Sequence, residues 1–261
     1  MLTLDQVYCG YDSEDVIRNV SFRVKEGDIL CLLGPNGCGK TTLLKAIAGL
    51  LPYKGHLRWL GQEIHTLKRN QLAAGIALMS QISETYFEYS VYDTVMLGRY
   101  LHGKKGFLPS ISDEDRVMVR KALEEVELWR EREHPITQLS GGQLQRVFLA
   151  RTFVQEPKLI LLDEPTNHLD LKYQLELMER LSVWSKQPGR AVIGVFHDLN
   201  LAMQFAEKVI ILDQGQVVLQ GPTGQVLQDS MISKVFDVDV LNYMQSSLKK
   251  WLPPLEGNDS R

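Results

Sequence analysis

The sequence lacks both a marked excess of charge and a set of paired cysteines. Its 261 residues carry 29 Lys and Arg against 32 Asp and Glu, a net charge of −3. Such a balance provides no broad basic surface for a polyanion, so we expect no nucleic-acid partner. The three cysteines, Cys9, Cys31 and Cys38, have neither the spacing of a zinc site nor an even number. This usage indicates a reducing compartment such as the cytosol.

Long apolar runs, internal repeats and low-complexity tracts are also missing. The most apolar stretches, ILCLL at 29–33 and LILL at 159–162, have the length of β-strands, whereas a membrane-spanning helix needs about 20 residues. The opening residues MLTLDQVY have neither the basic segment nor the apolar core of an export signal. We therefore expect that any membrane role of this chain goes through a partner.

The sequence does contain an alternation of strand-like and helix-like patterns. Apolar runs at 29–34, 158–163 and 191–197 each precede a helical pattern, which predicts an α/β fold with a buried, mostly parallel sheet. After the second run, apolar residues recur every three or four positions, so they are predicted to face the core. They are Leu171, Leu175, Met178, Leu181 and Trp184.

Residues from about 86 to 145 have a helical pattern interrupted by the loop HGKKGFLPS. Ser112 with Asp115 predicts a capped helix start, and the helix that follows can turn an apolar face inward. We interpret about 86–145 as a helical subdomain inserted into a core of about 1–85 and 146–235. A hairpin turning at Gly215 is predicted for 211–221, and 236–261 forms a C-terminal extension with a polar, frayed end.

The stretch GPNGCGKT predicts a phosphate-binding loop, because it fits G-x-x-x-x-G-K-[ST] between an apolar strand and a helix. Backbone N–H groups of such a loop converge on phosphate oxygens at a helix N-terminus. Lys40 is expected to reach the β- and γ-phosphates, and the Thr41 hydroxyl to bind Mg²⁺. The predicted nucleotide-binding residues of this loop are Gly34, Pro35, Asn36, Gly37, Cys38, Gly39, Lys40, Thr41 and Thr42.

Two adjacent carboxylates follow the strand at 158–163. Asp163 ends that strand and can hold Mg²⁺, and Glu164 comes directly after it. Two acids side by side at the edge of a P-loop sheet favour a metal ligand next to a general base.

A second glycine-rich turn lies at LSGGQ. Its residues Ser140, Gly141, Gly142 and Gln143 can present consecutive N–H groups to an anion at a helix start. The same residues also suit an ordinary N-cap at Ser140, and by themselves they do not decide between the two.

The order of these motifs resembles that of the nucleotide-binding subunit of ATP-binding cassette (ABC) transporters, from Tyr11 to about Phe236. The resemblance identifies GPNGCGKT as Walker A, LILLDE as Walker B and LSGGQ as the signature motif. Gln81 matches the Q-loop, Asp170 the D-loop and His197 the H-loop, while Tyr11 stands where an aromatic ring stacks on adenine. It implies a single ABC ATPase domain at 1–235, with a P-loop core, an N-terminal antiparallel β portion and a helical subdomain.

The resemblance also implies an assembly. Two cassettes pack head to tail, so Ser140 and Gly142 of one copy would contact the γ-phosphate bound by Lys40 of the other. Since this chain holds one cassette, a homodimer with two shared sites is expected. Within each site, the resemblance implies that Lys40, Gln81, Glu164 and His197 act in ATP hydrolysis, with Mg²⁺ held by Thr41, Gln81 and Asp163.

The aromatic segment after Gln81 has two interpretations. Tyr86, Phe87 and Tyr89 can form subdomain core, or they can form the docking site for a permease helix that the resemblance places beside the Q-loop. In the second case the chain is peripheral to the cytoplasmic side of the cell membrane, and a periplasmic or extracellular binding protein is an indirect partner.

The stretches TVMLGRYLH and TNHLD resemble those of bacterial importers of iron-siderophore, haem or cobalamin, although Leu101 stands where the usual pattern has Pro. Importers of zinc, manganese or molybdate have similar cassettes. A cassette ATPase without a transport role, in iron–sulfur assembly or repair, is the alternative from another class. A P-loop kinase or GTPase leaves LSGGQ unexplained.

Overall fold

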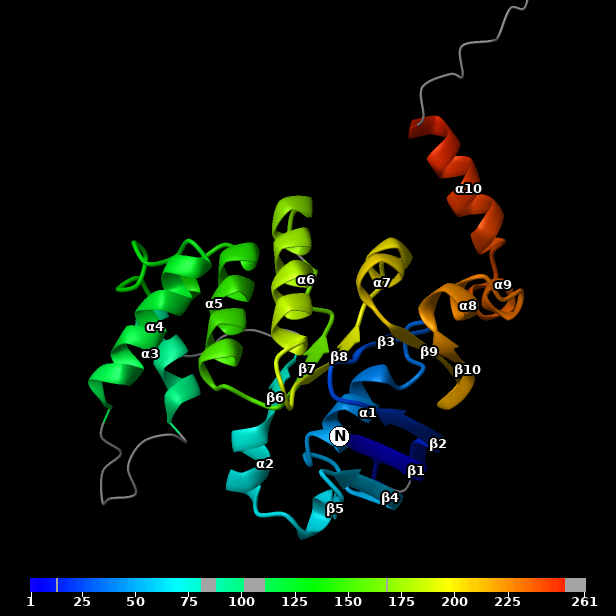
Figure 1. The fold of residues 1–261 in the computed structure, drawn as a ribbon, viewed down its shortest axis with the longest axis horizontal. Helices are drawn as coiled ribbons and strands as arrows, with labels where there is room; N and C mark the ends of the chain where they lie inside the picture. Colours follow the sequence, from blue (N-terminus) through cyan, green and yellow to red (C-terminus); the bar gives the residue numbers. More distant parts are fainter. Residues whose placement is uncertain (13, 81–87, 101–110, 168, 252–261) are drawn as a thin grey trace, which may run out of the picture.

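The computed structural model describes residues 1–12, 14–80, 88–100, 111–167 and 169–251. Two β-sheets form its centre, and helices cover them (Figure 1). The larger sheet has six strands in the order β10-β9-β3-β8-β7-β6. Its strands are β3 (Ile29–Leu33), β6 (Ile76–Met79), β7 (Leu159–Asp163), β8 (Ala191–Val195), β9 (Lys208–Asp213) and β10 (Gln216–Pro222). All are parallel except β10, which pairs antiparallel with β9.

The smaller sheet is antiparallel and comes from the N-terminal part of the chain. Its order is β2-β1-β4-β5. Its strands are β1 (Leu2–Tyr11), β2 (Glu14–Val24), β4 (Tyr53–Trp59) and β5 (Gln62–Glu63). Helix α1 (Lys40–Ile47) packs in the hydrophobic core between this sheet and the larger one, and α2 (Arg69–Gly75) leads into β6.

Strand β3 shows why the central strands are apolar without interruption. Leu30 and Leu32 pack into the core shared with α1 and the smaller sheet, whereas Ile29, Cys31 and Leu33 pack into a second core on the opposite face. Helices α6 (Leu171–Ser185), α7 (Leu199–Phe205), α8 (Thr223–Leu227) and α9 (Met231–Phe236) cover that second face. Both faces of such a parallel strand are buried, so its sequence does not alternate between apolar and polar residues.

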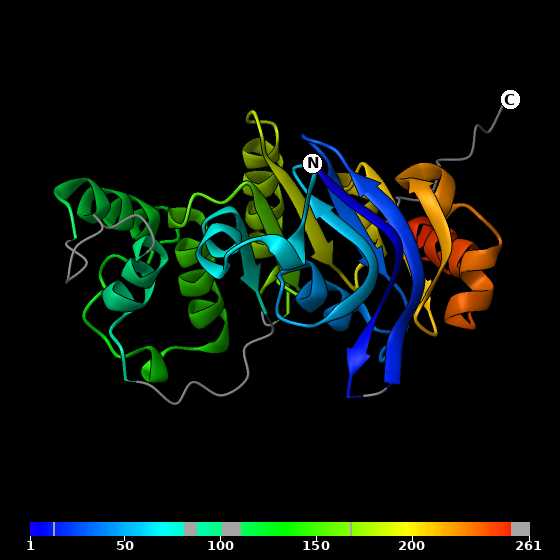
Figure 2. The same cartoon turned by 90° about the horizontal axis from the view of Figure 1, so that it is seen from below.

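A third hydrophobic core belongs to a group of helices at one end of the molecule, which both views separate from the C-terminal helices at the other end (Figures 1 and 2). The group contains α3 (Val91–Met96), the 3-10 turn Leu97–Arg99, α4 (Asp113–Glu125) and α5 (Gly141–Val154). Its centre is formed by buried side chains that pack together, among them Val95, Val119, Leu123 and Val147.

Arg99 is buried and joins these helices through ion pairs with buried Asp115 and exposed Glu156. Its Nε donates to Asp115 Oδ1 at 2.7 Å, and its Nη1 donates to Glu156 Oε2 and to the Val154 carbonyl, each at 2.7 Å. Burial alone would raise the pKa of the Asp115 carboxyl, but hydrogen bonds from Arg99 and Ser112 lower it to about 2. These contacts thus tie the segment after α3 to α4 and to the end of α5.

Several expectations from the sequence are met here, and one is wrong. The hairpin turns at Gln214–Gly215 between β9 and β10, and Ser112 with Asp115 forms a reciprocal cap on α4. On α6, Met178, Leu181 and Trp184 are buried, but Leu171 is 67% exposed. Leu171 is the first residue of α6, and the buried face of the helix begins a turn later.

The C-terminal extension contains a helix that was not predicted from the sequence. After α8 and α9 comes α10 (Val240–Trp251), which projects from the rest of the structure (Figure 1). Val240 is its one buried residue, and Tyr243, Leu248 and Trp251 are exposed. The polar end expected to be frayed lies outside the described residues. Within the described ranges, no helix has the length and apolar character needed to cross a bilayer.

Replacing Arg99 with Met should destabilise the protein strongly, because it leaves Asp115 buried without its cation. Breaking one partner of a buried pair costs about 3 kcal/mol or more. Lys54→Met is the matched control, because the Lys54–Asp15 pair at 3.0 Å is solvent-exposed and exposed pairs contribute less than about 1 kcal/mol. Urea unfolding measures both, and equal losses would contradict the prediction.

Candidate functional site

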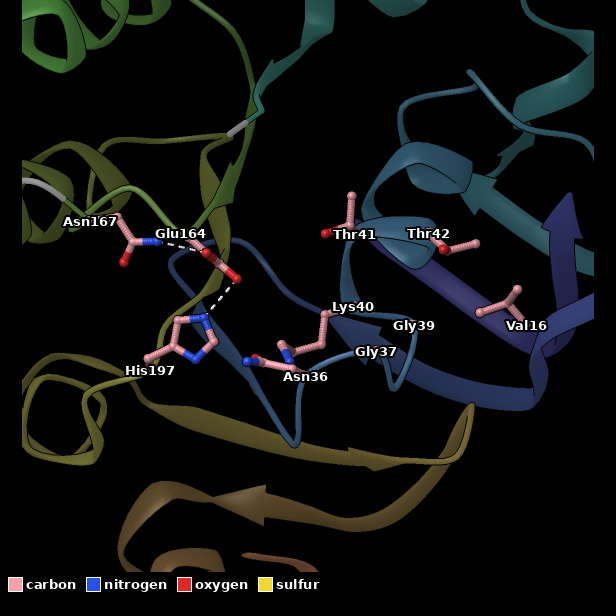
Figure 3. Close-up of a pocket in the computed structure, with 10 residues that line it drawn as sticks. All are labelled: Val16, Asn36, Gly37, Gly39, Lys40, Thr41, Thr42, Glu164, Asn167 and His197. Atoms are coloured by element: carbon pink, nitrogen blue, oxygen red, sulfur yellow. Dashed lines mark hydrogen bonds and ion pairs between the residues drawn. The ribbon is translucent and has the colours of Figure 1, made fainter. Parts of the chain in front are cut away.

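A cavity of about 600 Å³ opens beside the loop between β3 and α1. It is lined by Val16, Asn36, Gly37, Gly39, Lys40, Thr41, Thr42, Glu164, Asn167 and His197 (Figure 3). The loop depends on glycine at its first position. Gly34 has a φ of 146°, and a Cβ there would collide with the carbonyl oxygen of Leu212. The strand end therefore turns into the loop only with glycine at this position.

Lys40 is the first residue of α1, and its side chain is folded back onto its own loop. The ammonium Nζ donates to the carbonyl oxygens of Gly34 at 2.9 Å and Pro35 at 2.8 Å. Lys40 is only 6% exposed, and these two hydrogen bonds stabilise its buried ammonium group. They hold a cation beside the N-terminus of α1, where an anion is already favoured.

Thr41 and Asp163 bring two oxygens together at the sheet edge. The Thr41 hydroxyl donates to Asp163 Oδ1 at 3.1 Å. Burial raises the pKa of the Asp163 carboxyl, and the bond from Thr41 opposes that rise. A hydroxyl beside a carboxylate is the kind of oxygen pair that Mg²⁺ takes as ligands, with water and phosphate oxygens completing an octahedron.

Glu164 is held between two side chains. His197 Nε2 lies 2.6 Å from Glu164 Oε1, and the amide Nδ2 of Asn167 donates to Glu164 Oε2 at 2.6 Å (Figure 3). The backbone of Glu164 is left-handed, with a φ of 55°, and its N–H donates to the Val195 carbonyl at 3.1 Å. Left-handed backbone is unfavourable for a non-glycine residue and collects at functional sites.

The signature residues line a different cavity. This second cavity, of about 680 Å³, is lined by Ser140, Gly141, Gly142, Gln143, Arg146, Leu169, Asp170 and Tyr173. It shares no lining residue with the P-loop cavity. Ser140 caps α5, because its Oγ accepts from Gln143 N at 3.3 Å while Gln143 Oε1 accepts from Ser140 N at 3.0 Å. The N-cap interpretation is therefore correct, and the anion interpretation is compatible with it.

Asp170, Tyr11 and Tyr89 are further predicted residues that the structure describes. Asp170 caps α6 by accepting from Tyr173 N at 3.2 Å. Tyr11 ends β1, is exposed, and accepts a hydrogen bond from Lys45 Nζ at 3.2 Å. Tyr89 is also exposed. Gln81, Tyr86 and Phe87 lie outside the described residues.

Cys38 packs inside the loop, 3.8 Å from Lys40 Nζ. Burial raises the pKa of its thiol, and the neighbouring Lys40 cation only partly opposes this. A buried, protonated thiol is a poor nucleophile. Cys38 is therefore a small packing residue of the loop.

Two residues of this region were given no role of their own from the sequence, although Asn167 opens the NHLD stretch matched to the D-loop. Its position three residues after Glu164 was the one feature of the sequence that could have indicated a contact with that carboxylate. Gln145 is buried on α5, and its amide Nε2 donates to the carbonyl oxygens of Pro165 and Glu164. Its partners come from a distant part of the chain, so no local pattern marks it.

Comparisons with known proteins agree with this geometry. The sequence profile of the ABC transporter family matches residues 17–167. An iron(3+)-hydroxamate import ATP-binding protein of Bacillus subtilis is 36% identical over 239 residues, covering 91% of this chain and 88% of that protein. A ferric enterobactin transport ATP-binding protein of Escherichia coli is 33% identical over 234 residues, covering 89% of this chain and 85% of that protein.

Solved structures of ABC transporter cassettes have the same fold as this chain. A metal-chelate type ABC transporter in an inward-facing conformation superposes with a TM-score of 0.76 at 29% identity, covering 90% of this chain and 88% of that chain. A dimeric ATP-binding cassette with bound ADP and Pi superposes with a TM-score of 0.76 at 29% identity, covering 85% and 99%. The chain therefore belongs to the ABC transporter family and is an ATPase with the α/β cassette fold that the sequence predicts.

Proposed function

We propose that this chain binds Mg²⁺-ATP and hydrolyses it to drive a bacterial importer of iron-siderophore, haem or cobalamin-type chelates. The observation that carries the hydrolytic part is the P-loop cavity, in which Lys40, Thr41, Glu164 and His197 line one space. The names of the iron-chelate import relatives support the transport part.

The residues present fit a magnesium ion. Thr41 and Asp163 are already in contact, and Gln81 is the further ligand that the sequence predicts. When bound, Mg²⁺ would neutralise charge on the β- and γ-phosphates. Groups of three or more His, Cys, Asp or Glu suited to a metal are absent from the part of the chain that the structure describes.

The side chains of the cavity have separate tasks. Lys40 exchanges the carbonyls of Gly34 and Pro35 for phosphate oxygens, which keeps its charge satisfied. His197 turns from Glu164 Oε1 to the γ-phosphate. Glu164 takes a proton from a water molecule, whose oxygen attacks the γ-phosphorus in line. The bond from that phosphorus to the bridging oxygen breaks, and its electron pair leaves with ADP.

The second cavity completes the site of another copy. Ser140 and Gly142 lie outside the P-loop cavity of their own chain, and a head-to-tail homodimer would place them against the γ-phosphate bound to the partner's loop. The Ser140 hydroxyl and the Gly142 N–H at the start of α5 would supply the donors, because the Ser140 N–H already donates to Gln143. One chain thus holds two halves of different sites, and the solved dimeric cassette supports this arrangement.

A permease would dock next to the helical group. Tyr89, which is exposed and precedes α3, is the described member of the aromatic segment predicted for this contact. The chain would then be attached to the cytoplasmic face of the membrane through that permease. The binding protein that delivers the chelate on the other side would be an indirect partner.

Replacing Glu164 with Gln should leave ATP binding intact and slow hydrolysis by about 10²-fold or more, because a positioned base contributes on the order of 10²- to 10⁴-fold. Phosphate release and calorimetric ATP binding measure the two effects, and an ATP-bound dimer should accumulate. Glu179→Gln, an exposed change on α6, is the control. Near-normal turnover of Glu164→Gln would refute the base assignment.

Mixing Lys40→Ala with Ser140→Arg subunits tests the shared sites. Each homodimer should be inactive, whereas a mixed dimer has one site with intact Lys40 and intact Ser140. Vanadate trapping of labelled nucleotide, which needs only one competent site, should therefore recover in the mixture. A mixture that traps no more nucleotide than either homodimer would contradict the cross-subunit arrangement.

The permease contact predicts co-purification from membranes. The tagged chain should bring down a multispanning membrane protein, and Tyr89→Ala should reduce the yield of that complex severalfold. Tyr243→Ala, an exposed aromatic on α10, is the matched control and should leave the yield unchanged. Recovery of soluble partners alone would favour a role in assembly or repair over import.

A further inference from the structure

Asn167 contacts the carboxylate that we assign as the general base. Its Nδ2 donates to Glu164 Oε2 at 2.6 Å, while His197 contacts the other oxygen, Oε1, at the same distance (Figure 3). The two neighbours come from different strands, since Asn167 follows β7 and His197 follows β8. The two oxygens of Glu164 are therefore in different surroundings.

The backbone delivers the Asn167 side chain to this position. Glu164 adopts its left-handed conformation, and the Asn167 N–H then donates to the Glu164 carbonyl at 3.3 Å, which closes a turn over 164–167. Gln145 supports the same turn through the carbonyls of Pro165 and Glu164. One internal hydrogen bond and the bonds from Gln145 thus hold a turn that places the Asn167 amide next to the Glu164 carboxylate.

The chemistry of the contact favours one orientation of the charged base. A hydrogen bond from an amide to a carboxylate is stronger than one between neutral groups. With Oε2 held by Asn167, rotation of the carboxylate about its terminal bond is opposed. Oε1 then keeps its direction toward His197 and the P-loop cavity.

We propose that Asn167 is a positioning residue for ATP hydrolysis. It holds Glu164 Oε2 so that Oε1 is the oxygen that takes the proton of the attacking water. The inference rests on the proposed function of Glu164 as the base. It also gives His197 and Asn167 different tasks, because His197 leaves the carboxylate for the γ-phosphate and Asn167 stays.

Two other roles for Asn167 predict different results. As a contact between subunits, it would be needed for the ATP-bound dimer. As a structural residue of the turn, it would be needed for folding, and its effect would add to any change at Glu164. A positioning residue acts only through the Glu164 carboxylate, so its effect should disappear when that carboxylate is removed.

The test uses the full chain with Asn167→Ala and Asn167→Asp. Asn167→Ala should lower kcat about tenfold or more, since small misplacements of a reacting group cost up to about 10²-fold, and KM for ATP should change less than about twofold. Asn167→Asp has the same shape but sets one carboxylate against another, so it should lower kcat at least as far. Asn242→Ala, an exposed change on α10, is the control.

The second half of the test places Asn167→Ala in the Glu164→Gln background. Single-turnover hydrolysis should equal that of Glu164→Gln alone, and the ATP-bound dimer should form to the same extent. A normal kcat for both Asn167 variants, an additive loss in the double variant, or loss of the dimer would each overturn the proposal. Normal turnover of Glu164→Gln itself would instead refute the proposed base. Thermal melting confirms that each variant is folded.

Discussion

Parallel hydrogen bonding between β3, β8 and β7 brings the predicted site residues to one edge of the larger sheet. Leu32 pairs with Val195, and Val195 pairs with Asp163. The P-loop begins two residues after Leu32, His197 comes two residues after Val195, and Glu164 directly follows Asp163. Slipping one strand by a single residue would turn its side chains to the opposite face. The geometry of the cavity thus depends on the register of three strands that are buried on both faces.

The sequence predicted the parts of the site that are encoded locally. A P-loop is a continuous stretch whose glycines and lysine act through the backbone nearby, so the positions of Gly34 and Lys40 in the loop follow from the sequence alone. The cap at Ser112 and the turn at Gly215 are local in the same sense. The apolar strands predicted the α/β core because burial on both faces of a parallel sheet leaves a distinct pattern.

What the sequence could not predict depends on contacts between distant segments. Arg99 meets Asp115 and Glu156 only after three helical segments have packed. Leu171 fits the apolar period of its helix and is nevertheless exposed, because helical periodicity does not show where the covering layer ends. The separation of Ser140 from the P-loop cavity is likewise a property of the folded chain, which the resemblance implied and local spacing did not.

Helix α5 connects the two cavities within one chain. Its first residues line the signature cavity, and Gln145 bonds the turn that carries Glu164 in the P-loop cavity. Gly141, the first residue of α5, and Gln145 are four positions apart, or about 6 Å along a helix, and the buried amide leaves little freedom between them. We therefore expect a shift of α5 to change the position of Glu164, and thermodynamic linkage makes that influence mutual. The Gln145 side chain would thus couple the occupancy of the signature cavity to that of the P-loop cavity within one chain.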